Sequence, residues 1–116
     1  MLLTEINGLD YDNLSKRVNG MEMIIKKILK SFVGSIPDNL ASLKVAVESG
    51  DLEQIGFHAH TVKGVLQNIG AVESGELAKG IELSAKGGEL AFAKDNYLQL
   101  IAMVEQLVAD ITVALG

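Results

Sequence analysis

The fold of this chain is decided by residues 51–70, which read DLEQIGFHAHTVKGVLQNIG. The segment opens on Asp51, a residue type that accepts hydrogen bonds from the free N–H groups at a helix start, and it closes on Gly70, which suits a helix end. Between them, apolar side chains recur every three or four residues, as on the buried face of an α-helix. These residues are Leu52, Ile55, Ala59, Val62, Leu66 and Ile69. The segment is therefore predicted to be an amphipathic helix that packs against others.

The same period recurs through most of the remaining chain. Long helices are expected over 21–49, 73–86 and 90–115, and a short leading helix over about 10–18. In the first of them, Met23 and Ile24 are expected on or beside the buried face, and Pro37 predicts a kink or restart near Ser35. Four long amphipathic segments with short connections predict an all-α fold, an antiparallel up-down four-helix bundle with a short additional N-terminal helix. We expect one domain over 1–116, with the bundle at about 21–115.

Composition narrows the possible partners of this fold. The formal net charge of −5 argues against nucleic acid or an anionic membrane as the main partner, because both attract basic surfaces. The chain has no cysteine, so it forms neither disulfides nor thiolate metal sites. Its start lacks the basic and apolar character of a secretory signal, and nowhere do 18 apolar residues run unbroken. We therefore expect a cytoplasmic monomer.

A helical wheel identifies the exposed face of the helix over 51–70. His60 lies about 130° from the mean direction of the apolar residues, and Gly64 and Phe57 each lie about 170° away. Lys63, at about 70°, and Gln67, at about 110°, lie on the flank that leads toward His60. His58 falls on the opposite flank and is expected to have only a boundary role. The imidazole of His60 is thus predicted to face solvent.

An exposed imidazole beside a cation suits phosphoryl transfer. An unperturbed histidine is largely neutral near pH 7, so its free nitrogen is a nucleophile without a dedicated base. The ammonium of Lys63 could hold phosphoryl oxygens. Gly64 leaves a gap for an incoming surface, at a cost of roughly 1 kcal/mol in helix propensity. Phe57 is either a docking contact or a packing residue under the first helix or the bundle end.

Two sequence blocks carry a resemblance to a known family. His60-Thr61-Val62-Lys63-Gly64, followed by Asn68-Ile69-Gly70-Ala71, resembles the signature of histidine-containing phosphotransfer (HPt) domains of bacterial phosphorelays. The likeness extends to residues 8–10, Arg17, Gly20 and residues 48–52, and so to nearly the whole chain.

The resemblance implies a four-helix bundle in which His60 accepts a phosphoryl group from the aspartate of a receiver domain and passes it to another receiver. The implied partners are receiver domains of response regulators or of hybrid histidine kinases. Lys63 would stabilise the phosphoryl group, and the partner-contacting surface would comprise Gly56, Phe57, Thr61 and Gly64. Gln67, where the family often has a small residue, could hydrogen-bond the ring or the phosphoryl oxygens, or it could narrow the docking surface. The implied protein is a phosphoryl carrier without autonomous kinase activity. It would bind no cofactor of its own, and Mg²⁺ would come with the receiver.

Three other interpretations were weighed against the carrier. His58 and His60 diverge by about 200° around a helix, so they cannot chelate one metal ion, and no further ligand completes a set. A sensor-kinase dimerisation domain is disfavoured because Thr61, rather than an acidic residue, follows His60. A helical-bundle adaptor that binds a receiver or kinase domain without carrying phosphate stays open, although it leaves Lys63 and Gly64 unexplained.

Overall fold

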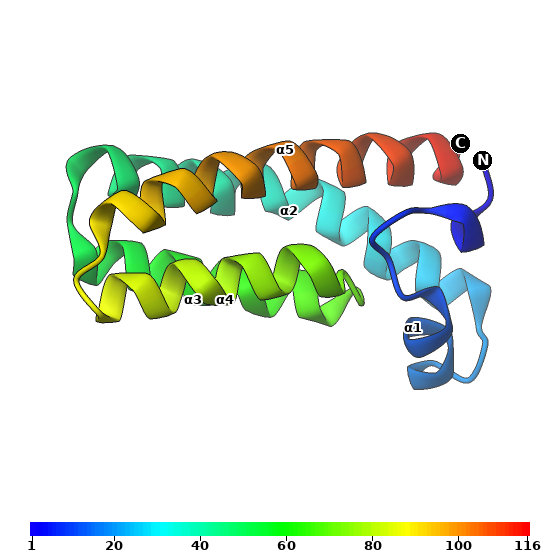
Figure 1. The fold of residues 1–116 in the computed structure, drawn as a ribbon. Coiled ribbons are helices and arrows are strands. Elements are labelled where there is room, and N and C mark those ends of the chain that lie inside the picture. The colour runs from blue at the N-terminus through cyan, green and yellow to red at the C-terminus, as the bar shows by residue number, and fades with distance from the viewer.

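The computed structural model describes residues 1–116, which form helices joined by short turns (Figure 1). A single 3-10 turn (Leu3–Glu5) and the short helix α1 (Tyr11–Arg17) precede four long helices. The long helices are α2 (Glu22–Ser49), α3 (Leu52–Asn68), α4 (Val72–Lys86) and α5 (Leu90–Leu115). The predictions of an all-α fold and of a short leading helix are confirmed.

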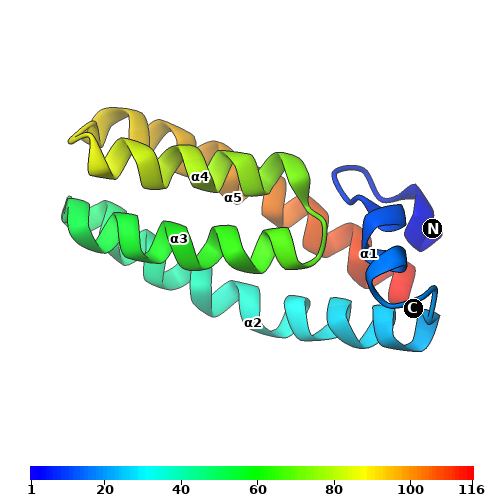
Figure 2. The ribbon, with the colours of Figure 1, turned by 90° about the horizontal axis from the view of Figure 1, so that it is seen from below.

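The four long helices close into a bundle. Successive helices run in opposite directions, and each packs against two others: α2 and α4 both contact α3 and α5. Figure 2 shows α3 between α2 and α4, with both termini at the end of the bundle where α1 lies. Because α2 and α5 are longer than α3 and α4, they extend past them at that end (Figure 1).

Local sequence signals set the helix boundaries. Gly50 ends α2 in the left-handed region, with φ of 71°, and its N–H donates to the carbonyl oxygens of Ala46 and Val47. The carboxylate of Asp51 then accepts a hydrogen bond of 3.2 Å from the N–H of Gln54 and so caps α3. Asp10 caps α1 in the same way through the N–H of Asn13, at 3.0 Å. The capping role predicted for Asp51 is confirmed.

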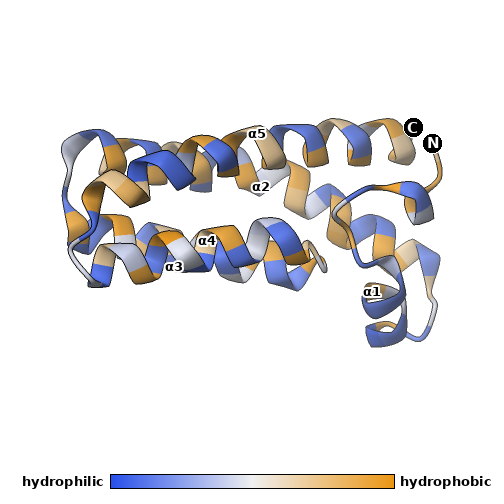
Figure 3. Cartoon of the chain, in the orientation of Figure 1, coloured by the Kyte–Doolittle hydropathy of each residue, from blue (hydrophilic) through white to orange (hydrophobic).

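One apolar core fills the space between the helices. Apolar and polar residues alternate along every helix, as Figure 3 shows. A fully buried Leu or Ile side chain contributes roughly 1.5–3 kcal/mol relative to exposure, so this core supplies the main stabilisation. Its fully buried large side chains are Leu14, Ile25, Leu29, Ile36, Leu43, Ile55, Val62, Leu66, Ile69, Ile81, Leu100 and Ile111.

Two predictions about α2 differ from the structure. The helix passes through Pro37 without ending, so the predicted restart near Ser35 does not occur. A proline inside a helix costs about 3 kcal/mol, and the burial of Phe32, Ile36 and Leu43 on either side offsets that cost. Ile24 and Met23 are exposed, at 37% and 72%, because they lie where α2 extends past its neighbours.

By length and composition alone, α5 could cross a bilayer. A core helix of a bundle meets the same criterion, and Leu100, Val104 and Ile111 of α5 are fully buried against the other helices. The bundle therefore accounts for the apolar stripe of α5.

The turn after α3 joins the N-terminal segment to the bundle. The N–H of Asp10 donates to the carbonyl oxygen of Gly70 at 2.7 Å, and the guanidinium of Arg17 donates to the carbonyl oxygen of Asn68. Gly70 has a φ of +77°, and a Cβ atom there would lie 2.9 Å from the carbonyl oxygen of Asp10. Only glycine fits this turn without displacing the backbone of the N-terminal segment.

Replacing Gly70 with alanine should lower the free energy of unfolding by about 1–3 kcal/mol, because the new methyl group meets backbone at a strained φ. Gly34→Ala is the matched control, since Gly34 lies within α2 and has open space around it. The control should gain about 0.5–1 kcal/mol from helix propensity. Urea unfolding measures both changes. A Gly70→Ala variant as stable as the wild type would contradict this explanation of the turn.

Candidate functional site

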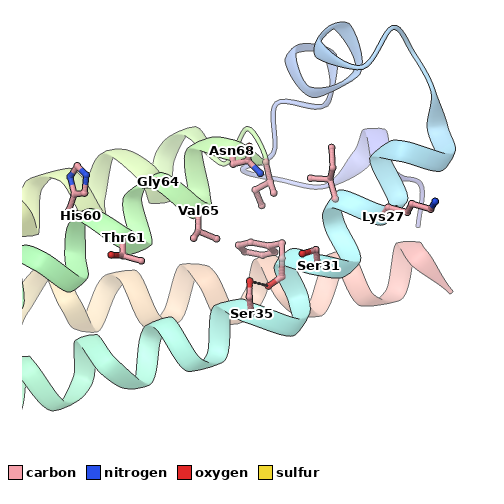
Figure 4. A pocket seen from close by; sticks show the side chains of 11 residues that line it. Lys27, Ser31, Ser35, His60, Thr61, Gly64, Val65 and Asn68 are labelled. Carbon is pink, nitrogen blue, oxygen red and sulfur yellow. Dashed lines mark hydrogen bonds between the residues drawn. The ribbon is translucent and has the colours of Figure 1, made fainter.

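His60 projects from the middle of α3 into solvent. Its side chain is 66% exposed, while its neighbours Ala59 and Val62 are fully buried on the opposite face of the helix. Figure 4 shows the ring extending away from the bundle axis. The predicted outward direction of His60 is confirmed.

A buried carboxylate from the adjacent helix holds this ring. Nδ1 of His60 lies 2.8 Å from Oε2 of Glu82 on α4, and the Glu82 side chain is only 8% exposed. An ionised carboxylate can only accept hydrogen bonds, so Nδ1 carries the ring proton and donates it to Glu82. Nε2 is then the nitrogen with a free lone pair. Sequence reasoning missed Glu82.

Lys63 contacts the same carboxylate. Its Nζ donates to Oε1 of Glu82 at 2.8 Å, and its side chain is 19% exposed. The hydrogen bond from Lys63 is the main cause that lowers the pKa of Glu82, and the bond from His60 lowers it further, whereas burial opposes both. Glu82 is therefore ionised at neutral pH, which supports its role as the acceptor for both side chains.

Lys86 is a second cation at this carboxylate. Its Nζ lies 3.6 Å from Oε2 of Glu82, one turn along α4, and its side chain is 68% exposed. One buried carboxylate thus lies among an imidazole and two ammonium groups. We name His60, Lys63, Glu82 and Lys86 the histidine cluster. It carries a net positive charge in a chain whose formal net charge is −5.

The position of Glu82 on α4 explains both its burial and its orientation. It lies one turn from Ala78 and one turn from Ala85, which are core residues of α4, so the backbone directs its side chain toward α3. An acidic residue at a core-facing position requires partners, because burying an unpaired charge is costly. This charged residue in an apolar stripe is the signal that could have identified Glu82 from the sequence.

A groove between α3 and α2 begins beside His60. It has a volume of about 710 Å³, and both helices contribute polar side chains and backbone to its walls. Gly64 lies in its α3 wall, and a Cβ atom there would have nothing within 4 Å. The open space predicted at Gly64 is therefore present. Figure 4 shows Thr61, Gly64, Val65 and Asn68 on the α3 side of the groove and Ser31 and Ser35 on the α2 side, with Lys27 at its far end.

The other residues predicted for the site lie around this centre. Phe57 is 63% exposed and makes an edge contact with the ring of His58, so it does not pack under α1 or the end of the bundle. Gln67 is exposed and forms no hydrogen bond with the His60 ring, whose Nδ1 bonds to Glu82. Gly56 faces α4, where its Cβ position lies 3.7 Å from Cβ of Ala85. Gly56 is therefore a helix-packing position, and its contact with a partner stays a prediction.

Comparison with known proteins gives consistent results. Residues 27–110 match the Hpt domain family, so the chain belongs to that family. It is 28% identical over 104 residues to the phosphorelay intermediate protein rdeA of Dictyostelium discoideum, across 90% of this chain and 41% of that protein. The chain thus spans about two fifths of the length of that relative.

The fold has a counterpart among solved structures. It matches the crystal structure of histidine-containing phosphotransfer protein B (HptB) from Pseudomonas aeruginosa PAO1 with a TM-score of 0.77 and 30% sequence identity. The match covers 94% of this chain and 91% of the other. The resemblance noted in the sequence blocks around His60 and Gly70 is therefore confirmed at the level of family and fold.

Replacing Glu82 with methionine should allow the ring proton of His60 to occupy either Nδ1 or Nε2, because the acceptor that holds the proton on Nδ1 is lost. The ¹⁵N chemical shifts of the two ring nitrogens should move toward each other, whereas those of His58 should stay constant. The variant should also lose about 1–3 kcal/mol of stability, because Lys63 loses its partner in a largely buried position. Unchanged His60 shifts would show that Glu82 does not fix the ring.

Proposed function

We propose that this chain carries a phosphoryl group on Nε2 of His60 between receiver domains of a phosphorelay. The observation that carries the proposal is an exposed imidazole whose Nδ1–H is held by a buried carboxylate, with two lysines at the same carboxylate. Membership in the Hpt family supports it, as does the likeness to proteins described as a phosphorelay intermediate and a histidine phosphotransfer protein.

The chemistry needs no base from this chain. The lone pair of Nε2 attacks phosphorus in the aspartyl phosphate of the receiver, the N–P bond forms, and the P–O bond to the aspartate breaks. The aspartate departs with the bonding electron pair as a carboxylate. Nδ1 keeps its proton throughout, so the phosphorylated ring is a cation, and Glu82 at 2.8 Å stabilises that charge. Transfer to a second receiver reverses these steps.

The histidine cluster also prepares the ring for attack. Phosphoryl transfer depends mainly on positioning and on stabilisation of charge. Glu82 fixes the orientation of the imidazole, and Lys63 holds the carboxylate through its second oxygen. The ring therefore loses little additional conformational freedom when a receiver docks. The adaptor alternative gives no role to a carboxylate placed on Nδ1.

The donor groups around His60 do not suit Mg²⁺, which prefers several oxygen ligands in octahedral geometry. The single carboxylate of the cluster already contacts two ammonium groups and an imidazole. Within the described chain, no group of three or more metal-ligating side chains is close enough to hold an ion. We therefore assign the Mg²⁺ of the transfer reaction to the receiver.

We propose that the receiver domain binds in the groove between α2 and α3. It starts at His60 and Thr61 and continues past Gly64, so a surface that enters it approaches the imidazole directly. The Cβ position of Gly64 is open, and even a small side chain there would narrow the approach. Phe57, 63% exposed on the other side of His60, offers an apolar contact to the same partner.

Incubation with a phosphorylated receiver domain and Mg²⁺ tests the proposal. Label should move to the wild-type chain as an acid-labile, base-stable adduct. His60→Gln should take up none, because it lacks the nucleophilic nitrogen. His58→Gln is the matched control and should be labelled like the wild type. Labelling of His60→Gln at the wild-type level would refute the proposed acceptor.

A second variant distinguishes docking of the receiver in the groove from the intrinsic reactivity of His60. Gly64→Leu should keep the fold and the reactivity of His60 toward phosphoramidate, a small phosphoryl donor. Its uptake of label from the receiver should be at least tenfold slower, because the new side chain obstructs docking. If Gly64→Leu and the wild type take up label from the receiver at equal rates, the groove is not the binding site of the receiver.

A further inference from the structure

The two lysines of the histidine cluster approach Glu82 from opposite directions. The antiparallel register of α3 and α4 is fixed at two points: Gly56 lies against Ala85, and Gly75 lies against Gln67. Lys63 is therefore on the α1 side of Glu82, and Lys86 extends from the other end of α4. Both lysines contact the carboxylate that holds the ring, so this carboxylate lies between two cations, and Lys86 is at the same oxygen, Oε2, as the imidazole.

The two lysines differ in how firmly they are held. Lys63 is 19% exposed and donates a hydrogen bond of 2.8 Å to Oε1 of Glu82. Lys86 is 68% exposed, and its Nζ lies 3.6 Å from Oε2, beyond normal hydrogen-bond distance. Moving Lys63 would leave a buried carboxylate without its strongest partner, whereas moving Lys86 breaks only a solvated ion pair. Lys86 is thus the cation that can relocate at low cost.

Charge balance also favours a second lysine. A phosphoryl group on Nε2 brings close to two negative charges near neutral pH. The charges of the phosphorylated ring with its Nδ1 proton and of the Glu82 carboxylate cancel each other, so two cations nearby would balance the added negative charge. Lys63 supplies one, and Lys86 supplies the other.

We propose that Lys86 makes the direct contact with the phosphoryl oxygens on His60, while Lys63 stays on Glu82 as a positioning residue. The proposal rests on the proposed function. It assigns different tasks to two lysines that the primary sequence places on different helices. Lys86 is then a catalytic residue, because it touches the transferred group. Lys63 acts through Glu82 on the orientation of the ring.

The experiment compares Lys86→Met, Lys86→Arg and Lys79→Met with the wild type. Lys79 is the matched control, since it is an exposed lysine two turns earlier on α4 and forms no ion pair. Each chain is phosphorylated on histidine with phosphoramidate, which needs no receiver, and the phosphohistidine is observed by ³¹P NMR. The phosphorus signal should move in Lys86→Met, return toward the wild-type position in Lys86→Arg, and stay unchanged in Lys79→Met.

Receiver transfer is the second measurement. Lys86→Met should accept label from a phosphorylated receiver roughly fivefold more slowly than the wild type, and Lys86→Arg should recover most of the rate. A phosphorus signal and a transfer rate in Lys86→Met that both equal those of the wild type would overturn the proposal.

The two measurements distinguish failure of the proposed function from failure of the Lys86 assignment. If receivers do not label His60 at all, the proposed function is refuted, but the ³¹P comparison still reports whether Lys86 contacts the phosphoryl group. If receivers label His60 normally, and Lys86→Met has the wild-type ³¹P signal and the wild-type transfer rate, only the assignment of Lys86 is wrong.

Discussion

The hydrogen bond between Nδ1 of His60 and Oε2 of Glu82, at 2.8 Å, is the interaction on which the site depends. A nucleophile that must be reached by another protein has to be exposed, and an exposed side chain is ordinarily free to rotate. Glu82 restricts that rotation. It lies in the interface of α3 and α4, with a side chain only 8% exposed, and it holds the ring through Nδ1, on the side that faces the bundle. The bundle thus provides a rigid support for a group that faces solvent.

The sequence block that carries the family resemblance has two physical tasks. His60 and Gly64 form the reactive face, where an imidazole and an open approach occur within about one helical turn, and Lys63 holds the carboxylate that orients the imidazole. Asn68 and Gly70 instead bind the N-terminal segment, through the carbonyl oxygens that accept from Arg17 and from the N–H of Asp10. The second task maintains the fold at the end of α3 and has no contact with the reactive nitrogen.

Much of this arrangement follows from local sequence. Helix periodicity and capping residues such as Asp51 and Gly50 act within a few positions, so the helices and the outward direction of His60 could be predicted. Glu82 could not be assigned to His60, because its contact depends on the register between two helices, which no local pattern defines. The same limit explains Gly56, whose packing against Ala85 is equally a matter of register. At Pro37, local propensity predicted a kink or restart, whereas burial on both sides keeps the helix continuous.

Because Glu82 holds the proton on Nδ1, Nε2 is the only reactive nitrogen of His60. A heteronuclear NMR experiment on the ¹⁵N-labelled phosphorylated chain, which correlates phosphorus with the ring nitrogens, tests this directly. We expect coupling of phosphorus to Nε2 of His60 alone. Phosphorus attached to Nδ1 of His60, or to His58, would contradict it.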